Sequence, residues 1–253
     1  MINCGSISRF ATPLFSILSA AILFSGLCAQ GENSETGAQA RSSIRDKLID
    51  SFPLNGIGGG GGPYFGEETA EIFAKKHGMA AAPVMTKMLT EDISPRLKAK
   101  VSFYFGHLED RSTTHSAVVP ITNLIRETVK APIGKDQLFL LHFAMLGLGF
   151  TKNGQALSTL EKMAHEEFWS KCTFLPEKGK TIADYREDAR SSAIGALPAC
   201  GTQAALDILV KLRDQADMRD MRETVEEWIE ECHDRISGAY LEKRKLVRPF
   251  LGK

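Results

Sequence analysis

The 253-residue sequence has few cysteines, few aromatic residues and no excess of either charge. Basic and acidic side chains number 31 each, so the formal net charge is zero. Because nucleic-acid binding relies on lysine and arginine to neutralise phosphates, this balance argues against a nucleic-acid partner. Beyond the first 29 residues only Cys172, Cys200 and Cys232 remain. Three thiols in a chain of this length do not form a disulfide framework, although a single disulfide stays an alternative to buried free thiols.

The sequence also lacks the short motifs of common catalytic and metal centres. It contains no HExxH motif, no paired CxxC and no GxSxG nucleophile turn. Cys232, His233 and Asp234 stand in a row, but neighbouring residues on a helix point about 100° apart and do not converge. We therefore predict no catalytic residue, no metal and no cofactor.

Strand patterns are missing as well, since no run alternates with period two over the length of a strand. Apolar residues make up 43% of the chain and charged residues 25%, which is typical of a globular protein. From Glu67 to Ile236 the apolar spacing is helical almost throughout. The sequence therefore predicts an all-α fold.

The first 29 residues have the layout of a secretory signal peptide. Arg9 is the only charge before the apolar run 10–27, and small and polar residues follow. An uncleaved membrane anchor is the alternative. Cys28 stands where bacterial lipoproteins carry their lipidated cysteine, although Leu27 before it is larger than that site prefers. We expect an exported protein of the periplasm or cell envelope, with ordinary cleavage near residues 28–30 favoured over a tether through Cys28.

Residues 30–66 are predicted to form a disordered, glycine-rich leader with one short helix. Ile44, Leu48 and Phe52 are four residues apart and place that helix at 43–52. The stretch GIGGGGGPYFG at 56–66 resembles a phosphate-binding loop only in its glycine content. It lacks the preceding strand and the Lys-Ser/Thr that such a loop needs, so we interpret it as a flexible joint.

Four segments repeat the same apolar pattern, and three of them follow another helical stretch. The four segments are 80–89, 117–125, 155–163 and 204–212, and the preceding helices are 94–110, 135–150 and 185–201. Glycine lies near the end of each preceding helix, at Gly106, Gly149 and Gly201, where it suits a helix C-terminus. Helix pairs at a spacing near forty residues indicate an α-solenoid.

The segment 186–214 resembles a HEAT-type repeat of the short bacterial, phycobilin-lyase-like kind. Its matching residues are Arg186, Ala189, Ala193, Ile194, Gly195, Leu197, Ala205, Leu206, Leu209, Leu212 and Asp214. Earlier units match less closely. The resemblance implies a superhelix of about four helix pairs over 67–236, and it specifies a fold rather than a chemistry.

Three segments fall outside the regular pairs. The helix at 216–236, with Met218, Val225 and Cys232 on one stripe, is expected to cap the stack. The irregular stretch 165–184 carries four apolar side chains that could bind a partner: Phe168, Trp169, Phe174 and Leu175. Residues 237–253 read as a disordered basic tail, with contact to an acidic partner or lipid surface as the alternative.

These features favour a non-enzymatic scaffold that presents a solenoid surface to a protein partner. One alternative is a lyase-type or other enzyme that binds a small molecule, which would need a deep polar pocket, expected near Trp169 and His142. A third hypothesis is a structural envelope protein tethered at Cys28. An open groove would favour the scaffold, and an enclosed pocket with perturbed histidines would favour small-molecule binding.

Overall fold

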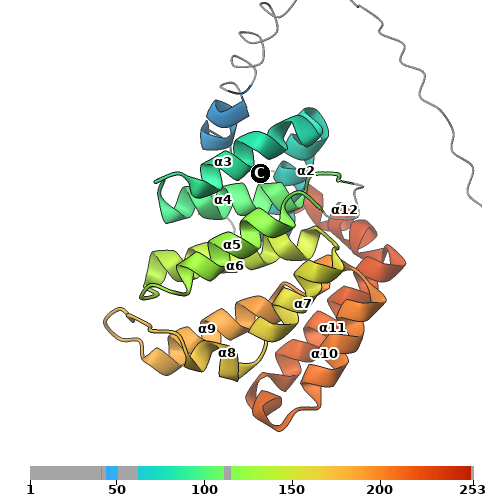
Figure 1. The fold of residues 1–253 in the computed structure, drawn as a ribbon. Helices are drawn as coiled ribbons and strands as arrows, with labels where there is room; N and C mark the ends of the chain where they lie inside the picture. Colours follow the sequence, from blue (N-terminus) through green and yellow to red (C-terminus); the bar gives the residue numbers. More distant parts are fainter. Residues whose placement is uncertain (1–40, 42–43, 51–61, 111–114, 252–253) are drawn as a thin grey trace, which may run out of the picture.

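The computed structural model describes residues 41, 44–50, 62–110 and 115–251, which form helices joined by loops and contain no strand. Figure 1 shows the arrangement. The α-helices in chain order are α2 (Gly62–His77), α3 (Ala82–Thr90), α4 (Pro95–Gly106), α5 (Val118–Thr128), α6 (Lys135–Phe150), α7 (Gly154–Met163), α8 (Glu166–Ser170), α9 (Ile182–Gly195), α10 (Gln203–Arg213), α11 (Arg222–Ser237) and α12 (Ala239–Leu251). Short 3₁₀ helices lie at η2 (Gly78–Ala81), η3 (Pro198–Cys200) and η4 (Ala216–Met221). The prediction of an all-α fold is therefore confirmed for these residues.

The segments predicted as helix pairs are helices with nearly the expected bounds. The four repeated segments are α3, α5, α7 and α10, and the helices expected before the last three are α4, α6 and α9. Polar side chains start several of them: Asn153 accepts a hydrogen bond from the Gln155 amide at α7, and Thr181 accepts one from the Asp184 amide at α9. These caps satisfy amide groups that have no partner within the helix.

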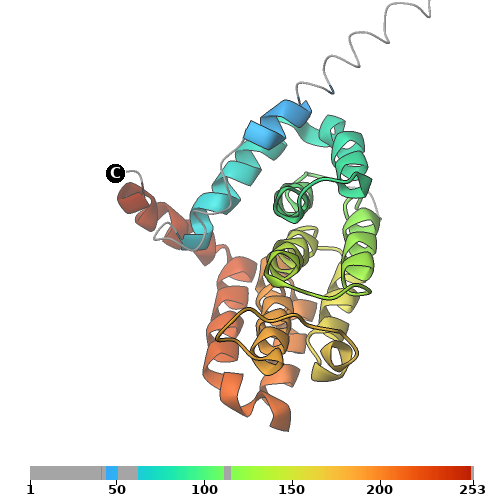
Figure 2. The same cartoon turned by 90° about the vertical axis from the view of Figure 1, so that its left-hand side faces the viewer.

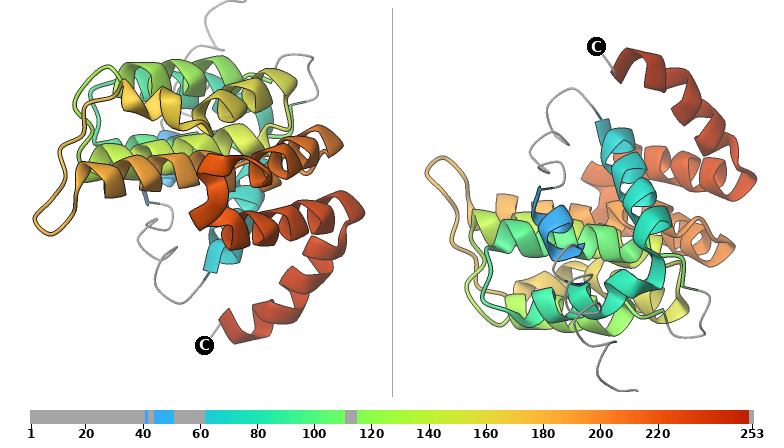
Figure 3. Two further views of the ribbon diagram at one scale, coloured as in Figure 1. Left: turned by 90° about the horizontal axis from the view of Figure 1, so that it is seen from below. Right: turned by 90° about the horizontal axis from the view of Figure 1, so that it is seen from above.

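The helices pack in two rows. In one row α4 lies against α6 and α6 against α9, while α3, α5 and α7 follow each other in the second row. Figure 3 shows these layers in its left panel, with α5 and α7 above α6 and α9. Helix α6 contacts neighbours in both rows, and Leu141, Met145 and Leu148 are fully buried on it. This explains why its sequence is apolar on nearly every side.

Helices α4 and α6 approach each other closely at two glycines. A β-carbon built on Gly106 would overlap the carbonyl of Gly147, and one built on Gly147 would overlap the carbonyl of Ser102. Gly149 lies equally close to Ala196, at the end of α9. Gly106 is the last residue of α4, and Gly149 is the last residue but one of α6. Gly201, with a left-handed φ of 55°, ends the 3₁₀ helix η3, whereas α9 itself already ends at Gly195.

The ends of the helical region differ from the predicted bounds. Helix α2 begins at Gly62, so residues 62–66 belong to it and not to the leader. Residues 44–50 are helical, and Ile44 and Leu48 are buried against the rest of the core. Cys28, the expected signal peptide 1–29, Phe52 and the glycines at 56–61 lie outside the described residues.

The C-terminal segment is helical rather than an unstructured tail. Helix α12 follows α11, so α11 is not the terminal cap that its apolar stripe predicted. Lys243 pairs with Asp234, Arg244 with Glu71, and Lys245 with Glu242. These basic side chains therefore have acidic neighbours within the protein, and contact of the segment with an acidic partner or lipid surface stays a prediction. Among the described residues, no helix has the length and apolar content needed to span a membrane.

Arg190 links α9 to the end of α7 and to η4. Its guanidinium is buried, donates to the Ala164 carbonyl at 2.8 Å and pairs with Asp217 at 2.6 Å. We expect Arg190→Ala to lower the free energy of unfolding by about 3 kcal/mol, because both acceptors lose their donor and a cavity remains. Urea denaturation of both proteins measures this. An equal midpoint for the two would contradict the role assigned to Arg190.

Candidate functional site

A polar pocket of about 680 Å³ lies where the C-terminal ends of α4 and α6 meet the start of α7. Helices α2, α11 and α12 form its other side. Figure 2 shows α2 reaching across to α12, and residues of both helices, from opposite ends of the described chain, line this side of the pocket. The pocket volume is within the range of small-molecule sites, but its lining is more polar than such sites usually are.

Glu67 on α2 is the centre of a buried charged cluster on this wall. Its carboxylate, 5% exposed, accepts hydrogen bonds from Arg235 at 2.7 Å and from the Tyr240 hydroxyl at 2.9 Å. The Arg235 guanidinium lies 3.6 Å from the centre of the Tyr240 ring. Burial and the neighbouring Glu67 carboxylate raise the pKa of Tyr240, which stays a neutral donor.

Arg244 on α12 adds a second link to α2. It donates to both carboxylate oxygens of Glu71, at 2.9 and 2.6 Å, and lies 3.5 Å from Glu67. Burial raises the pKa of Glu71, but the hydrogen bond and charge of Arg244 outweigh it and hold the pKa below its usual value. A two-pronged pair of this kind fixes the direction of both side chains. We call Glu67, Glu71, Arg235, Tyr240 and Arg244 the α2–α12 clasp.

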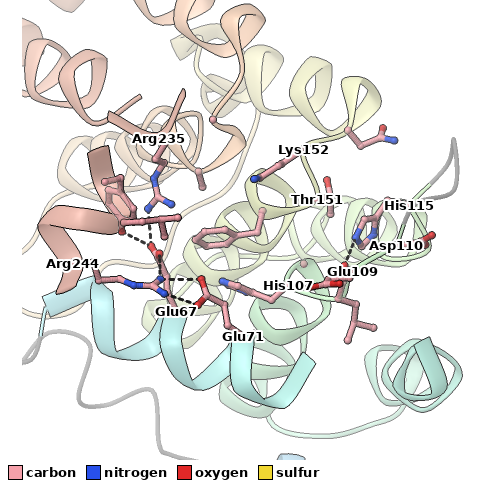
Figure 4. Close-up of a pocket in the computed structure, with 18 of the residues that line it drawn as sticks. Glu67, Glu71, His107, Glu109, Asp110, His115, Thr151, Lys152, Arg235 and Arg244 are labelled. Atoms are coloured by element: carbon pink, nitrogen blue, oxygen red, sulfur yellow. Dashed lines mark hydrogen bonds and ion pairs between the residues drawn. The ribbon is translucent and has the colours of Figure 1, made fainter. Parts of the chain in front are cut away.

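His107 follows α4 and lies beside the clasp. Its Nδ1 is 2.9 Å from the Phe103 carbonyl, and its ring centre is 3.9 Å from that of Phe150. The Nε2 atom is buried and has no hydrogen-bond partner among the described residues. Figure 4 shows the ring directed towards Glu71 and Arg244. Burial lowers the pKa of His107 to about 4, so the ring is neutral at pH 7.

The opposite wall is built from the loop after α4 and from the α6–α7 junction. Glu109, Asp110 and His115 contribute from the first, and Thr151, Lys152 and Asn153 from the second. Asp110 accepts a hydrogen bond from the Ser116 amide at 2.6 Å, and burial lowers the pKa of His115. Lys152 has a left-handed φ of 53°, and this turn places Gly154 at the start of α7.

The pocket lies away from the residues that sequence reasoning selected for binding. Trp169 is fully buried and donates to the Met163 carbonyl at 2.6 Å, and Phe174 is also buried. Their apolar surface is therefore used within the core, and Phe168 is partly buried against it. Of these four side chains only Leu175 is exposed, at 59%.

The histidines and cysteines singled out in the sequence also lie outside this pocket. His142 forms a hydrogen bond with Ser192 at 3.1 Å, and His142 and Trp169 do not line the pocket. Cys172, Cys200 and Cys232 are free thiols, and burial raises the pKa of Cys200 to about 12. No group of His, Cys, Asp and Glu suited to a metal ion occurs within the described part of the chain.

Sequence reasoning missed the pocket because its residues come from segments far apart in the chain. Glu67 and Tyr240 are 173 residues apart. One local signal was present: Glu67, Glu71, Tyr240 and Arg244 have helical i, i+4 spacing, which places each pair on one helix face. Nothing in the sequence indicated that these two faces meet.

Comparisons with protein-family models, with curated proteins and with solved structures found no match to this chain. The resemblance to HEAT-type repeats therefore rests on the residues named above, and membership of that family remains a prediction. The site must be interpreted from its own geometry.

The buried neutral state of His107 predicts a pH dependence of stability. Its pKa is about 4 in the folded protein against an ordinary value of 6.5, so the unfolded chain binds more protons between these values. The stabilising contribution is full above pH 6.5 and is lost as the pH falls towards 4. We expect wild type to lose about 2 kcal/mol more than His107→Asn between pH 7 and pH 5. Urea melts at both pH values test this, and identical losses would contradict it.

Proposed function

We propose that this chain is a non-enzymatic binding protein built as an α-solenoid, and that the pocket beside the α2–α12 clasp holds a small polar ligand. The observation that carries the proposal is a pocket of about 680 Å³ with charged side chains from four separate segments. Keeping buried charges in such an arrangement costs stability unless each is paired. The two helix rows support the solenoid, and the proposal includes the export expected from residues 1–29.

We favour binding over catalysis because two polar groups of the pocket, His107 and Thr151, are poorly placed to act as a base or a nucleophile. The buried Nε2 atom of His107 faces the clasp, so it is poorly placed to exchange protons with a ligand. The Thr151 hydroxyl donates to the Leu148 carbonyl at 2.6 Å and is not activated by a base among the described residues. The remaining polar groups of the pocket can recognise charge and hydrogen-bonding pattern.

Gly154 offers a direct way to block the pocket. It lines the pocket at the first residue of α7, and a β-carbon there would meet no atom within 4 Å. Because Gly154 lines the pocket, we expect an indole at this position to take up part of the pocket volume. Lys178→Trp, at an exposed loop residue outside the pocket lining, is the matched control for added aromatic surface.

Thermal-shift screening of the full chain tests the proposal. The panel contains amino acids, short peptides, sugars, sugar acids and nucleotides. A ligand at one hundred times its Kd stabilises the folded state by about 2.7 kcal/mol. We expect at least one class to stabilise wild type and Lys178→Trp but not Gly154→Trp. Stabilisation that survives in Gly154→Trp, or none from any class, would contradict a ligand pocket here.

A protein partner is the second candidate, supported by one exposed apolar site. Leu175 is 59% exposed and Ile182 50% exposed, on either side of the loop 176–181. If this site binds a partner, Leu175→Glu should abolish co-purification of a defined protein from the envelope fraction, while Gly154→Trp should retain it. Loss in Gly154→Trp alone would instead place the partner at the pocket.

A further inference from the structure

The charges of the pocket separate into the mutually paired charges of the clasp and three lining charges outside it. The clasp contains two carboxylates and two guanidinium groups that neutralise each other. Outside the clasp, the lining charges are Lys152, Glu109 and Asp110. Lys152 and Glu109 are exposed, and neither forms an ion pair with any other described residue. A ligand would therefore meet one cationic and one anionic position.

The cationic position combines a lysine with a helix start. Lys152 immediately precedes Asn153, the N-cap of α7, and both line the pocket together with Gly154. The amides of the first turn carry partial positive charge, which favours an anionic group. Arg235 adds a second cation on the facing wall, although its hydrogen bonds go to Glu67 and Glu231. A carboxylate is the group that this part of the pocket suits.

The anionic position lies on a different element. Glu109 and Asp110 follow α4, and Figure 4 shows Glu109 and Lys152 entering the same pocket from separate segments. These two carboxylates favour an ammonium group and would repel a phosphate or a dicarboxylate. The lining holds four acidic and three basic side chains, so a purely anionic ligand is disfavoured overall.

We propose that the ligand is a short peptide with free termini, bound by its carboxylate at Lys152 and the start of α7 and by its ammonium group at Glu109 and Asp110. This inference rests on the proposed function. A pocket of 680 Å³ corresponds to about 20 water-sized volumes, which accommodates a tripeptide and exceeds a single small amino acid.

Calorimetric titration of the full chain with trialanine in four forms tests the inference. The forms are the free peptide, the N-acetyl peptide, the C-terminal amide and the doubly blocked peptide, with free alanine as the length control. Since a hydrogen bond to a charged group contributes about 1.5 to 3 kcal/mol, each single block should weaken binding roughly tenfold or more. Alanine should bind more weakly than trialanine, because it fills less of the pocket.

Two variants assign the ends of the peptide. In Lys152→Gln the C-terminal amide should bind as well as the free peptide, and in Glu109→Gln the penalty for N-acetylation should shrink. Lys178→Gln and Glu187→Gln, at exposed residues outside the pocket lining, should retain both penalties. The same penalties in Lys152→Gln and Glu109→Gln as in wild type would overturn the assignment of the two positions.

Some outcomes overturn only the peptide assignment, and others overturn the proposed binding pocket as well. Equal affinity for free and blocked peptides, or stronger binding of alanine than of trialanine, overturns the peptide assignment. A second outcome is that a sugar or nucleotide binds, that no peptide binds, and that Gly154→Trp abolishes this binding. This outcome also overturns the peptide assignment, but it leaves the pocket as the binding site. Failure of every ligand class overturns both.

Discussion

Replacing Gly147 by alanine is expected to lower the free energy of unfolding by about 3 kcal/mol. A β-carbon at this position would overlap the Ser102 carbonyl on α4, and backbone atoms cannot turn away as a flexible side chain can. Helices α4 and α6 would have to separate, which would loosen the packing of both rows. Urea denaturation followed by circular dichroism gives the value.

Gly154→Ala is the matched control for Gly147→Ala. Both glycines are helical and both changes add one methyl group, but the new β-carbon at Gly154 meets no atom within 4 Å. We expect no loss of stability and a gain of up to about 1 kcal/mol, because alanine restricts the unfolded chain. Equal destabilisation by the two changes would show that α4 and α6 do not cross at Gly147.

Glu67→Gln is expected to destabilise the protein by about 3 kcal/mol and to release α12 from α2. The change leaves the Arg235 guanidinium, 12% exposed, without its closest carboxylate, and removal of one partner from a buried pair typically costs 3–5 kcal/mol. Glu231, at 2.8 Å from Arg235, keeps the loss near the lower end. Hydrogen exchange of the α12 amides should become faster than in wild type.

Glu71→Gln tests whether burial determines how much stability is lost when a carboxylate of the clasp is removed. Glu71 pairs with Arg244 but is 45% exposed, so solvent weakens this pair and compensates its loss. We expect a loss of about 1 kcal/mol or less, with exchange of α12 closer to that of wild type. A larger effect from Glu71→Gln than from Glu67→Gln would reverse the roles that the structure gives these two carboxylates.

The helical elements were predictable because each depends on contacts close in sequence. The period of the apolar residues placed α5, α6 and α10 within a few residues of their observed bounds. Helix α12 was missed because its first half is rich in charge, and its stability comes from Tyr240 and Arg244 bonding to α2. The role of Gly147 was also hidden, since close packing depends on the partner helix and not on the local pattern.

The candidate site could not be predicted, because it depends on which helix ends meet. Trp169 and Phe174 attracted attention as large apolar residues in an irregular stretch, and the structure places both in the core. An irregular stretch often binds partners, but it can equally supply side chains that fill the gap between two helices. By contrast, Glu67 is one glutamate among several in the sequence, and only the fold shows that it is buried.

Ring NMR of the six histidines tests the central claim most directly, because two of them line the pocket and the others do not. The best ligand from the thermal-shift panel would be titrated into uniformly ¹⁵N-labelled protein. We expect shifts in the ring signals of His107 and His115 that follow the binding isotherm, with His142 and His165 unchanged. Shifts confined to His142 or His165 would place the ligand near α8 and α9 and would contradict a ligand site in this pocket.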